Sequence, residues 1–179
     1  LNVVKRARQP FSHFNSRFST LATNLDIENW NIIGMKQGGG GGKGVVNLDR
    51  PKVHLENASE ASLLACQHPF ESPPGSPLRT STRHGLQAGI LLAASRVNVL
   101  LSGHVHAPSA TVWEHSDGKY LAISSGTLST RLRHCPPSFN RIDIIDNYLD
   151  VSVYDLSQDS LNSRPLGRWN LNTLEPIAP

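Results

Sequence analysis

The chain has 179 residues, of which 38% are hydrophobic and 17% are charged, and its net charge is +3 at pH 7. This length suffices for one domain with a hydrophobic core, and the composition excludes a disordered chain. No apolar run approaches the roughly twenty residues of a membrane-spanning helix, and no signal peptide is evident. Two cysteines, Cys66 and Cys135, are too few for a disulfide framework, which favours a reducing compartment such as the cytoplasm.

The first pattern that predicts structure is a short apolar strand over residues 30–35. It leads into a glycine-rich stretch, residues 38–44, that invites comparison with a phosphate-binding P-loop. The P-loop pattern needs glycine at the position of Gln37 and serine or threonine at the position of Gly44. A flexible loop is therefore the better interpretation of this stretch.

A strand–loop–helix–strand order follows. Residues 62–66 are an apolar run typical of a buried strand, and the proline-rich residues 71–77 predict a surface loop. A helix is expected next, with Ser81 or Thr82 as its N-cap, and residues 97–101 predict a second buried strand. The buried stripe expected for this helix consists of Leu86, Ile90, Leu91 and Ala94. Such a βαβ unit is normally parallel and right-handed.

The remainder of the chain predicts antiparallel strands. Alternating apolar runs flank an Asp-Gly pair at residues 117–118 and an Asp-Asn pair at residues 146–147, which predicts two hairpins. Residues 158–179 are expected to be a polar tail, in which Trp169 and Leu171 fit a last edge strand. A parallel βαβ unit followed by antiparallel hairpins predicts a layered α/β sandwich.

The most informative motif is Gly-His-Val-His at residues 103–106, directly after the second strand of the βαβ unit. Open α/β sheets place their ligand sites at the carboxyl ends of their strands, and paired histidines there suit a metal ion. A turn after Gly103 is needed to bring both imidazoles to one side. Because parallel strands end at one rim, Gln67 and His68 should lie beside this motif. A surface loop with two exposed histidines is the alternative.

Several other polar side chains carry weaker patterns. Arg131 and Arg133 follow a Gly-Thr turn and could bind a phosphate, because guanidinium groups make bidentate contacts with anions. A solvated rim is the alternative for both. His84 and His115 are expected to face solvent, and Cys66 is expected to be a packed core thiol rather than a reactive one.

Three segments together resemble the calcineurin-like metallophosphoesterase family. They are LACQHPF at residues 64–70, LSGHVH at residues 101–106 and SGTLSTRLR at residues 125–133. Their order and spacing resemble the second half of such a domain over at least residues 60–155. The chain starts with leucine rather than methionine, and its opening LNVV resembles the residues after the family's Gly-Asn-His-Asp motif. Residues 1–179 are therefore expected to be a single partial domain.

The resemblance implies phosphoester hydrolysis, with two divalent metal ions (manganese, iron or zinc) activating a water that attacks phosphorus. His104 and His106 would each bind one metal. The family's further histidine ligand is replaced by Gln67, whose amide oxygen binds zinc or iron less well, with His68 beside it. The family's carboxylate motifs are absent from the chain, so no residue is predicted to be catalytic. The isolated chain is expected to be inactive without the missing N-terminal half of the domain.

Two other functions stay open beside hydrolysis of a phosphoester or nucleotide. A degenerate relative that has lost its metal at Gln67 would serve as a non-catalytic binding scaffold. A nucleic-acid-binding module is suggested only by the isoelectric point of about 9.1. No membrane partner is expected.

Overall fold

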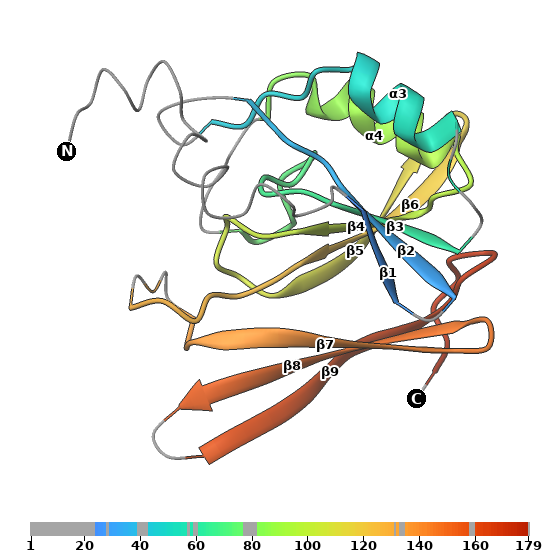
Figure 1. The fold of residues 1–179 in the computed structure, drawn as a ribbon. Coiled ribbons are helices and arrows are strands. Elements are labelled where there is room, and N and C mark those ends of the chain that lie inside the picture. Colours follow the sequence, from blue (N-terminus) through green and yellow to red (C-terminus); the bar gives the residue numbers. More distant parts are fainter. Residues whose placement is uncertain are drawn as a thin grey trace, which may run out of the picture.

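Two β-sheets and two helices make up the described part of the chain. The computed structural model describes residues 24–27, 29–38, 43–56, 58, 61–76, 82–130, 132, 135–157 and 160–178. Both helices lie on one side of the larger sheet, and the smaller sheet lies on its other side (Figure 1). The predicted layered α/β sandwich is thus the observed architecture. Neither of the helices described has the length and apolar character that crossing a bilayer requires.

The larger sheet has six strands in the order β1-β2-β3-β4-β6-β5. Their bounds are Asn24–Ile27 (β1), Trp30–Gly34 (β2), Ser62–Ala65 (β3), Val99–Ser102 (β4), Ser109–His115 (β5) and Gly118–Ser124 (β6). The neighbours β2, β3, β4 and β6 pair in parallel, whereas β1 and β5 are antiparallel edge strands. The strands predicted from the apolar runs are therefore confirmed, as is the hairpin that joins β5 and β6.

Helix α4 (Gly85–Ala93) links the parallel strands β3 and β4, so the predicted βαβ unit is confirmed. Its predicted N-cap is wrong: His84, in the left-handed conformation with φ 62°, occupies that position. The hydroxyl of Thr82 instead donates to the carbonyl of Pro69 at 2.6 Å, and Ser81 lies outside the described residues. A second, shorter helix, α3 (Asp49–Glu56), packs beside α4.

The predicted buried stripe of α4 is only partly right, because Leu91 packs against the hydrophobic core but Leu86 and Ala94 are exposed. Leu86 is 53% exposed, whereas Ala88, Gly89 and Leu92 are buried. The physical reason is close approach: a Cβ atom on Gly89 would lie only 3.0 Å from the carboxylate oxygen of Glu71. Ala88 and Gly89, together with Leu92, therefore form the buried face of α4. The positions of the large apolar residues alone do not identify this face.

The smaller sheet consists of β7 (Ser138–Ile145), β8 (Tyr148–Ser157) and β9 (Ser160–Asn170), all antiparallel. The predicted hairpin around residues 146–147 is therefore confirmed. The segment expected to be a polar tail is largely the edge strand β9, which includes the buried Trp169.

Each face of the larger sheet has its own hydrophobic core. One core lies beneath the helices and includes Leu64, Leu92, Leu100 and Tyr120. The other lies between the two sheets and includes Leu63, Val99, Leu121, Ile123, Leu149, Val151 and Trp169. Burial of a large aliphatic side chain contributes about 1.5–3 kcal/mol, so these two cores hold the layers together. The carboxyl edge of β3 and β4 is thereby fixed in place.

Candidate functional site

The chain turns directly after β4, at the position where the Gly-His-Val-His motif needs a turn. His104 and His106 both adopt left-handed backbone conformations, with φ of 68° and 58°. Val105 between them is fully buried, and its N–H donates to the carbonyl of Gly103 at 2.8 Å. A left-handed conformation costs a non-glycine residue about 1–3 kcal/mol, and such strain concentrates at functional sites. A buried valine therefore anchors a tight turn that presents two partly exposed histidines.

The segment after β3 meets this turn, as expected for parallel neighbours. The N–H of Gly103 donates to the carbonyl of Gln67 at 3.1 Å, so pairing continues past the strands. The ring centroids of His68 and His104 lie 4.1 Å apart, with an angle of 43° between the rings. The prediction that both segments lie at one rim of the sheet is confirmed.

The backbone of His68 is held by Gln37, and its ring is closely packed. The side-chain amide of Gln37 accepts from its N–H at 2.6 Å and donates to its carbonyl at 2.9 Å. Gly44 packs against the side chain of His68. A Cβ atom added at Gly44 would lie only 2.7 Å from the Cβ and Cγ atoms of His68. Sequence reasoning missed this role of Gln37 and Gly44, although they are the two positions at which the P-loop pattern failed.

The electrostatic state of His68 suits a metal ligand. The side chain is buried, and among the described residues neither ring nitrogen has a hydrogen-bond partner. Burial lowers the pKa of His68, because a charged imidazolium loses its hydration there. The ring is therefore held neutral, the form in which imidazole binds a metal. Gln67, by contrast, is exposed at the rim.

The donor set fits only part of a metal site. Nowhere in the described part of the chain do three side chains of the histidine, cysteine, aspartate and glutamate types gather closely enough to hold a metal ion. The rim brings the imidazoles of His68 and His104 together, with His106 on the same turn. Arg131 and Arg133, the predicted phosphate ligands, lie outside the described residues.

A second cluster of titratable groups joins the β5–β6 hairpin to the loop after β3. The carboxylate of Glu71 accepts the hydroxyl of Tyr120 at 3.0 Å and lies 3.1 Å from Nε2 of His115. The prediction that His115 faces solvent is therefore wrong, since its side chain is only 10% exposed. Burial, and then the charge of Glu71, raise the pKa of Tyr120. Because Tyr120 is fully buried, these contacts hold the loop after β3 against the β5–β6 hairpin.

Two further predictions concern single side chains. His84 is exposed as expected, and its Nδ1 lies 3.2 Å from the carbonyl oxygen of Val46. Burial raises the pKa of the Cys66 thiol to about 12, and the thiol donates to the carbonyl of His68 at 3.0 Å. Cys66 is thus the unreactive packed thiol that the sequence predicted.

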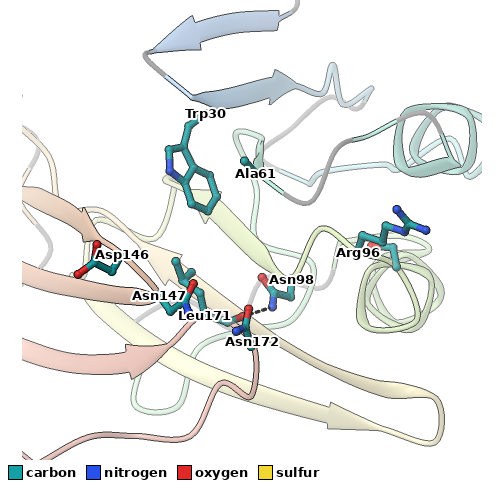
Figure 2. A pocket seen from close by; sticks show the side chains of 9 residues that line it. Trp30, Ala61, Arg96, Asn98, Asp146, Asn147, Leu171 and Asn172 are labelled. Carbon is teal, nitrogen blue, oxygen red and sulfur yellow. Dashed lines mark hydrogen bonds between the residues drawn. The ribbon is translucent and has the colours of Figure 1, made fainter.

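A polar pocket of about 460 Å³ lies at the other, amino-terminal end of the parallel strands (Figure 2). It is lined by Trp30, Ala61, Ser95, Arg96, Asn98, Asp146, Asn147, Leu171 and Asn172. Two of these lining residues are joined by a hydrogen bond, in which the side-chain amide of Asn98 donates to the carbonyl of Leu171 at 2.6 Å. None of the rim histidines lines this pocket, so the chemistry predicted for them lies elsewhere.

No protein-family model matches the chain, and no curated protein matches it. Its structure is similar to Vps29 from Entamoeba histolytica complexed with Zn²⁺, with 18% identity and a TM-score of 0.36, over 83% of this chain and 59% of that one. For Vps29 from Cryptosporidium parvum the identity is 16% and the TM-score 0.36, over 65% of this chain and 73% of that one. The likeness is distant.

A third similar structure is GAP50, the anchor in the inner membrane complex of Plasmodium. It has 13% identity and a TM-score of 0.45, over 80% of this chain and 52% of that one. The chain thus spans 59% of the length of the first Vps29 structure and about half of GAP50. Similarity at this level assigns neither an activity nor a metal to this chain.

Proposed function

We propose that this chain contributes the histidine ligands of a metal-dependent phosphoester hydrolase of the calcineurin-like metallophosphoesterase type. One observation carries the proposal. His104 and His106 both adopt the left-handed conformation at the carboxyl edge of the parallel strands, and the ring of His104 lies beside the buried ring of His68. That edge is where α/β sheets place ligand sites.

In this function each residue of the rim has a distinct task. The imidazoles of His104 and His106 bind manganese, iron or zinc, and Gln67 offers a weaker amide oxygen. His68 supports the ring of His104 from behind, 4.1 Å away. Arg131 and Arg133 hold the phosphate of a phosphoester or nucleotide substrate. Two divalent ions, when bound, polarise the phosphoryl oxygen and lower the pKa of the attacking water.

The remaining ligands are expected to be carboxylates from outside the described residues. Bridged two-metal sites need acidic ligands, and the described residues hold no group of three or more histidine, cysteine, aspartate or glutamate side chains that could bind a metal ion by itself. We therefore expect the 179 residues alone to bind metal weakly and to be inactive. Activity would need the N-terminal half of the domain, supplied by further polypeptide. A cytoplasmic location is part of the same proposal.

The test is hydrolysis by the chain produced together with the coding sequence that adjoins it. Release of p-nitrophenol from bis(p-nitrophenyl) phosphate is followed with Mn²⁺ and with EDTA, and bound metal is measured by mass spectrometry. We expect Mn²⁺-dependent turnover that His104→Ala and His106→Ala each lower at least about a hundredfold. His84→Asn, an exposed histidine in the same left-handed conformation, is the matched control. Turnover that EDTA leaves unchanged would overturn the proposal.

A non-catalytic scaffold is the second candidate, favoured by the presence of an amide, Gln67, where the family resemblance implies a histidine ligand. Gln67→His separates the two functions. In a hydrolase it should tighten zinc binding about tenfold or more, because imidazole is the better ligand. In a scaffold it should create neither metal binding nor turnover. Nucleic-acid binding, the third possibility, would require an affinity for DNA that falls steeply with salt.

A further inference from the structure

The polar pocket of Figure 2 lies where distant parts of the chain meet. Trp30 is the first residue of β2, and Asn98 directly precedes β4. Asn147 lies in the turn between β7 and β8, and Asn172 follows β9. Both sheets therefore contribute to the walls of the pocket. The phosphoester chemistry proposed above uses none of these residues.

Hydrogen bonds between the walls hold the pocket in shape. The side-chain amide of Asn98 donates to the carbonyl of Leu171 at 2.6 Å, and the N–H of Leu171 donates to the carbonyl of Asn147 at 2.7 Å. These two bonds join the larger sheet to the smaller one. On the side of α4, the hydroxyl of Ser95 donates to the carbonyl of Leu92 at 2.8 Å. A site that is already ordered loses little freedom when a ligand binds.

Several polar side chains of the pocket carry unused hydrogen-bonding groups. Within the part of the chain that the structure describes, the side chains of Asp146, Asn147 and Asn172 are exposed and have no hydrogen-bond partner. Asn98 uses its side-chain nitrogen for the bond to Leu171, which leaves its Oδ1 atom unpaired among the same residues. An amide both donates and accepts, whereas a carboxylate only accepts. The pocket thus offers donors and acceptors side by side.

The indole of Trp30 adds a flat apolar wall. Trp30 packs against the core between the sheets, and it lines both this pocket and the cavity between the sheets. Figure 2 shows its ring on one side of the pocket, with Asn98, Asn147 and Asn172 on the opposite side. An indole fixed by a hydrophobic core presents a rigid face on which a ring can stack.

The charges of the pocket favour a neutral ligand. Arg96 and Asp146 are the charged residues of its lining, and their formal charges cancel. The carboxylate of Asp146 would repel a phosphate or a carboxylate, so a nucleotide is disfavoured. A pyranose has an apolar C–H face that stacks on an indole, and each of its hydroxyl groups both donates and accepts. The volume of about 460 Å³ lies in the range of small-ligand sites, about 300–1,000 Å³.

We propose that this pocket binds a neutral pyranose sugar. The apolar face of the sugar ring stacks on Trp30. Its hydroxyl groups bond to the carboxylate of Asp146 and to the amides of Asn147 and Asn172, with the Oδ1 atom of Asn98 as a further acceptor. The same ring occurs in a free monosaccharide and at the end of a glycan.

The experiment is an NMR titration of the isotope-labelled 179-residue chain without added metal, so its result is independent of the phosphoesterase proposal. The probes are glucose, galactose, mannose and N-acetylglucosamine, with adenosine monophosphate as the anionic comparison. We expect at least one sugar to shift the indole N–H signal of Trp30 and the amide signals of Asn147 and Asn172, with saturation at millimolar concentration. The indole signal of Trp113, which does not line the pocket, should stay in place. No shift with any sugar, or a larger shift with adenosine monophosphate, would overturn the proposal.

Two pairs of matched variants test the contacts. Trp30→Leu keeps an apolar side chain but loses the flat ring, so it should weaken binding about tenfold, whereas Trp113→Leu should not. Asp146→Asn keeps a residue that tolerates the left-handed conformation (φ 54°) and should weaken binding severalfold. Asp117→Asn, in the turn of the other hairpin, is its control. Circular dichroism verifies that each variant is folded.

The exposed position of Asp146 keeps the test decisive if Trp30→Leu does not fold. Unchanged affinity in Asp146→Asn, or equal losses in a variant and its control, would overturn the proposal. Maltose and lactose distinguish the two sources of the sugar. Tighter binding of a disaccharide than of its monosaccharides identifies a glycan, and equal binding identifies a free sugar.

Discussion

The contact between Gly44 and His68 allows a sharp test of how the rim is held. A Cβ atom at position 44 would lie 2.7 Å from Cβ and Cγ of His68 and 3.1 Å from its Nδ1. The ring cannot move away easily, because Gln37 holds both backbone groups of His68, the side chain is buried, and the ring of His104 lies 4.1 Å from it. Overpacking of this kind costs about 1–3 kcal/mol. Gly44→Ala should therefore lower the free energy of unfolding by about that amount.

The assay is urea denaturation followed by tryptophan fluorescence, with Gly38→Ala as the matched control. A Cβ atom on Gly38 would lie 3.9 Å from the nearest atom, the carbonyl oxygen of Val45, which is ordinary contact. The control should be neutral or gain about 0.4–1 kcal/mol, because alanine restricts the unfolded chain. If Gly44→Ala unfolds at the same urea concentration as Gly38→Ala, the packing described for His68 is wrong.

Three further outcomes follow from buried polar groups. Because burial raises the pKa of Cys66 to about 12, iodoacetamide at pH 8 should alkylate Cys66 far more slowly in the folded chain than in urea. Mass spectrometry measures the two rates of alkylation. Because burial lowers the pKa of His68, its neutral ring favours folding above about pH 6.5, and stability falls as the pH drops toward the folded pKa. Thermal unfolding between pH 7.5 and 5 checks that slope, which His68→Gln should flatten. Tyr120→Phe removes the hydrogen bond to Glu71 and should cost about 1.5–3 kcal/mol in urea denaturation, whereas an unchanged midpoint would mean that this bond contributes nothing.

Strands and hairpins that depend only on neighbouring residues along the chain could be predicted from the sequence. Apolar runs bounded by polar turns gave β3 and β4, and the Asp-Gly and Asp-Asn pairs gave both hairpins. The parallel βαβ rule then placed His68 beside His104, which the ring distance of 4.1 Å bears out. These predictions hold because each needs only the neighbours of a residue along the chain and one rule of topology.

What the sequence could not supply depends on contacts between distant segments. Gln37 lies 31 residues before the backbone that it clamps, and no local pattern links it to His68. The buried face of α4 depends on how closely the helix approaches its neighbours, which favours Gly89 over Leu86. His115 is drawn out of solvent by the carboxylate of a residue 44 positions earlier. Each case is a tertiary contact that overrides a preference of the local sequence.

Binding of a divalent metal ion by His104 and His106 can be observed residue by residue. Manganese is paramagnetic, so a titration of the chain with substoichiometric Mn²⁺, followed by the imidazole proton resonances, reports directly which histidines are near the ion. The resonances of His104 and His106 should broaden first, with those of the neighbouring His68, while that of His115, at the far end of β5, stays sharp. Equal broadening of all histidines, or none at the rim, would contradict the claim.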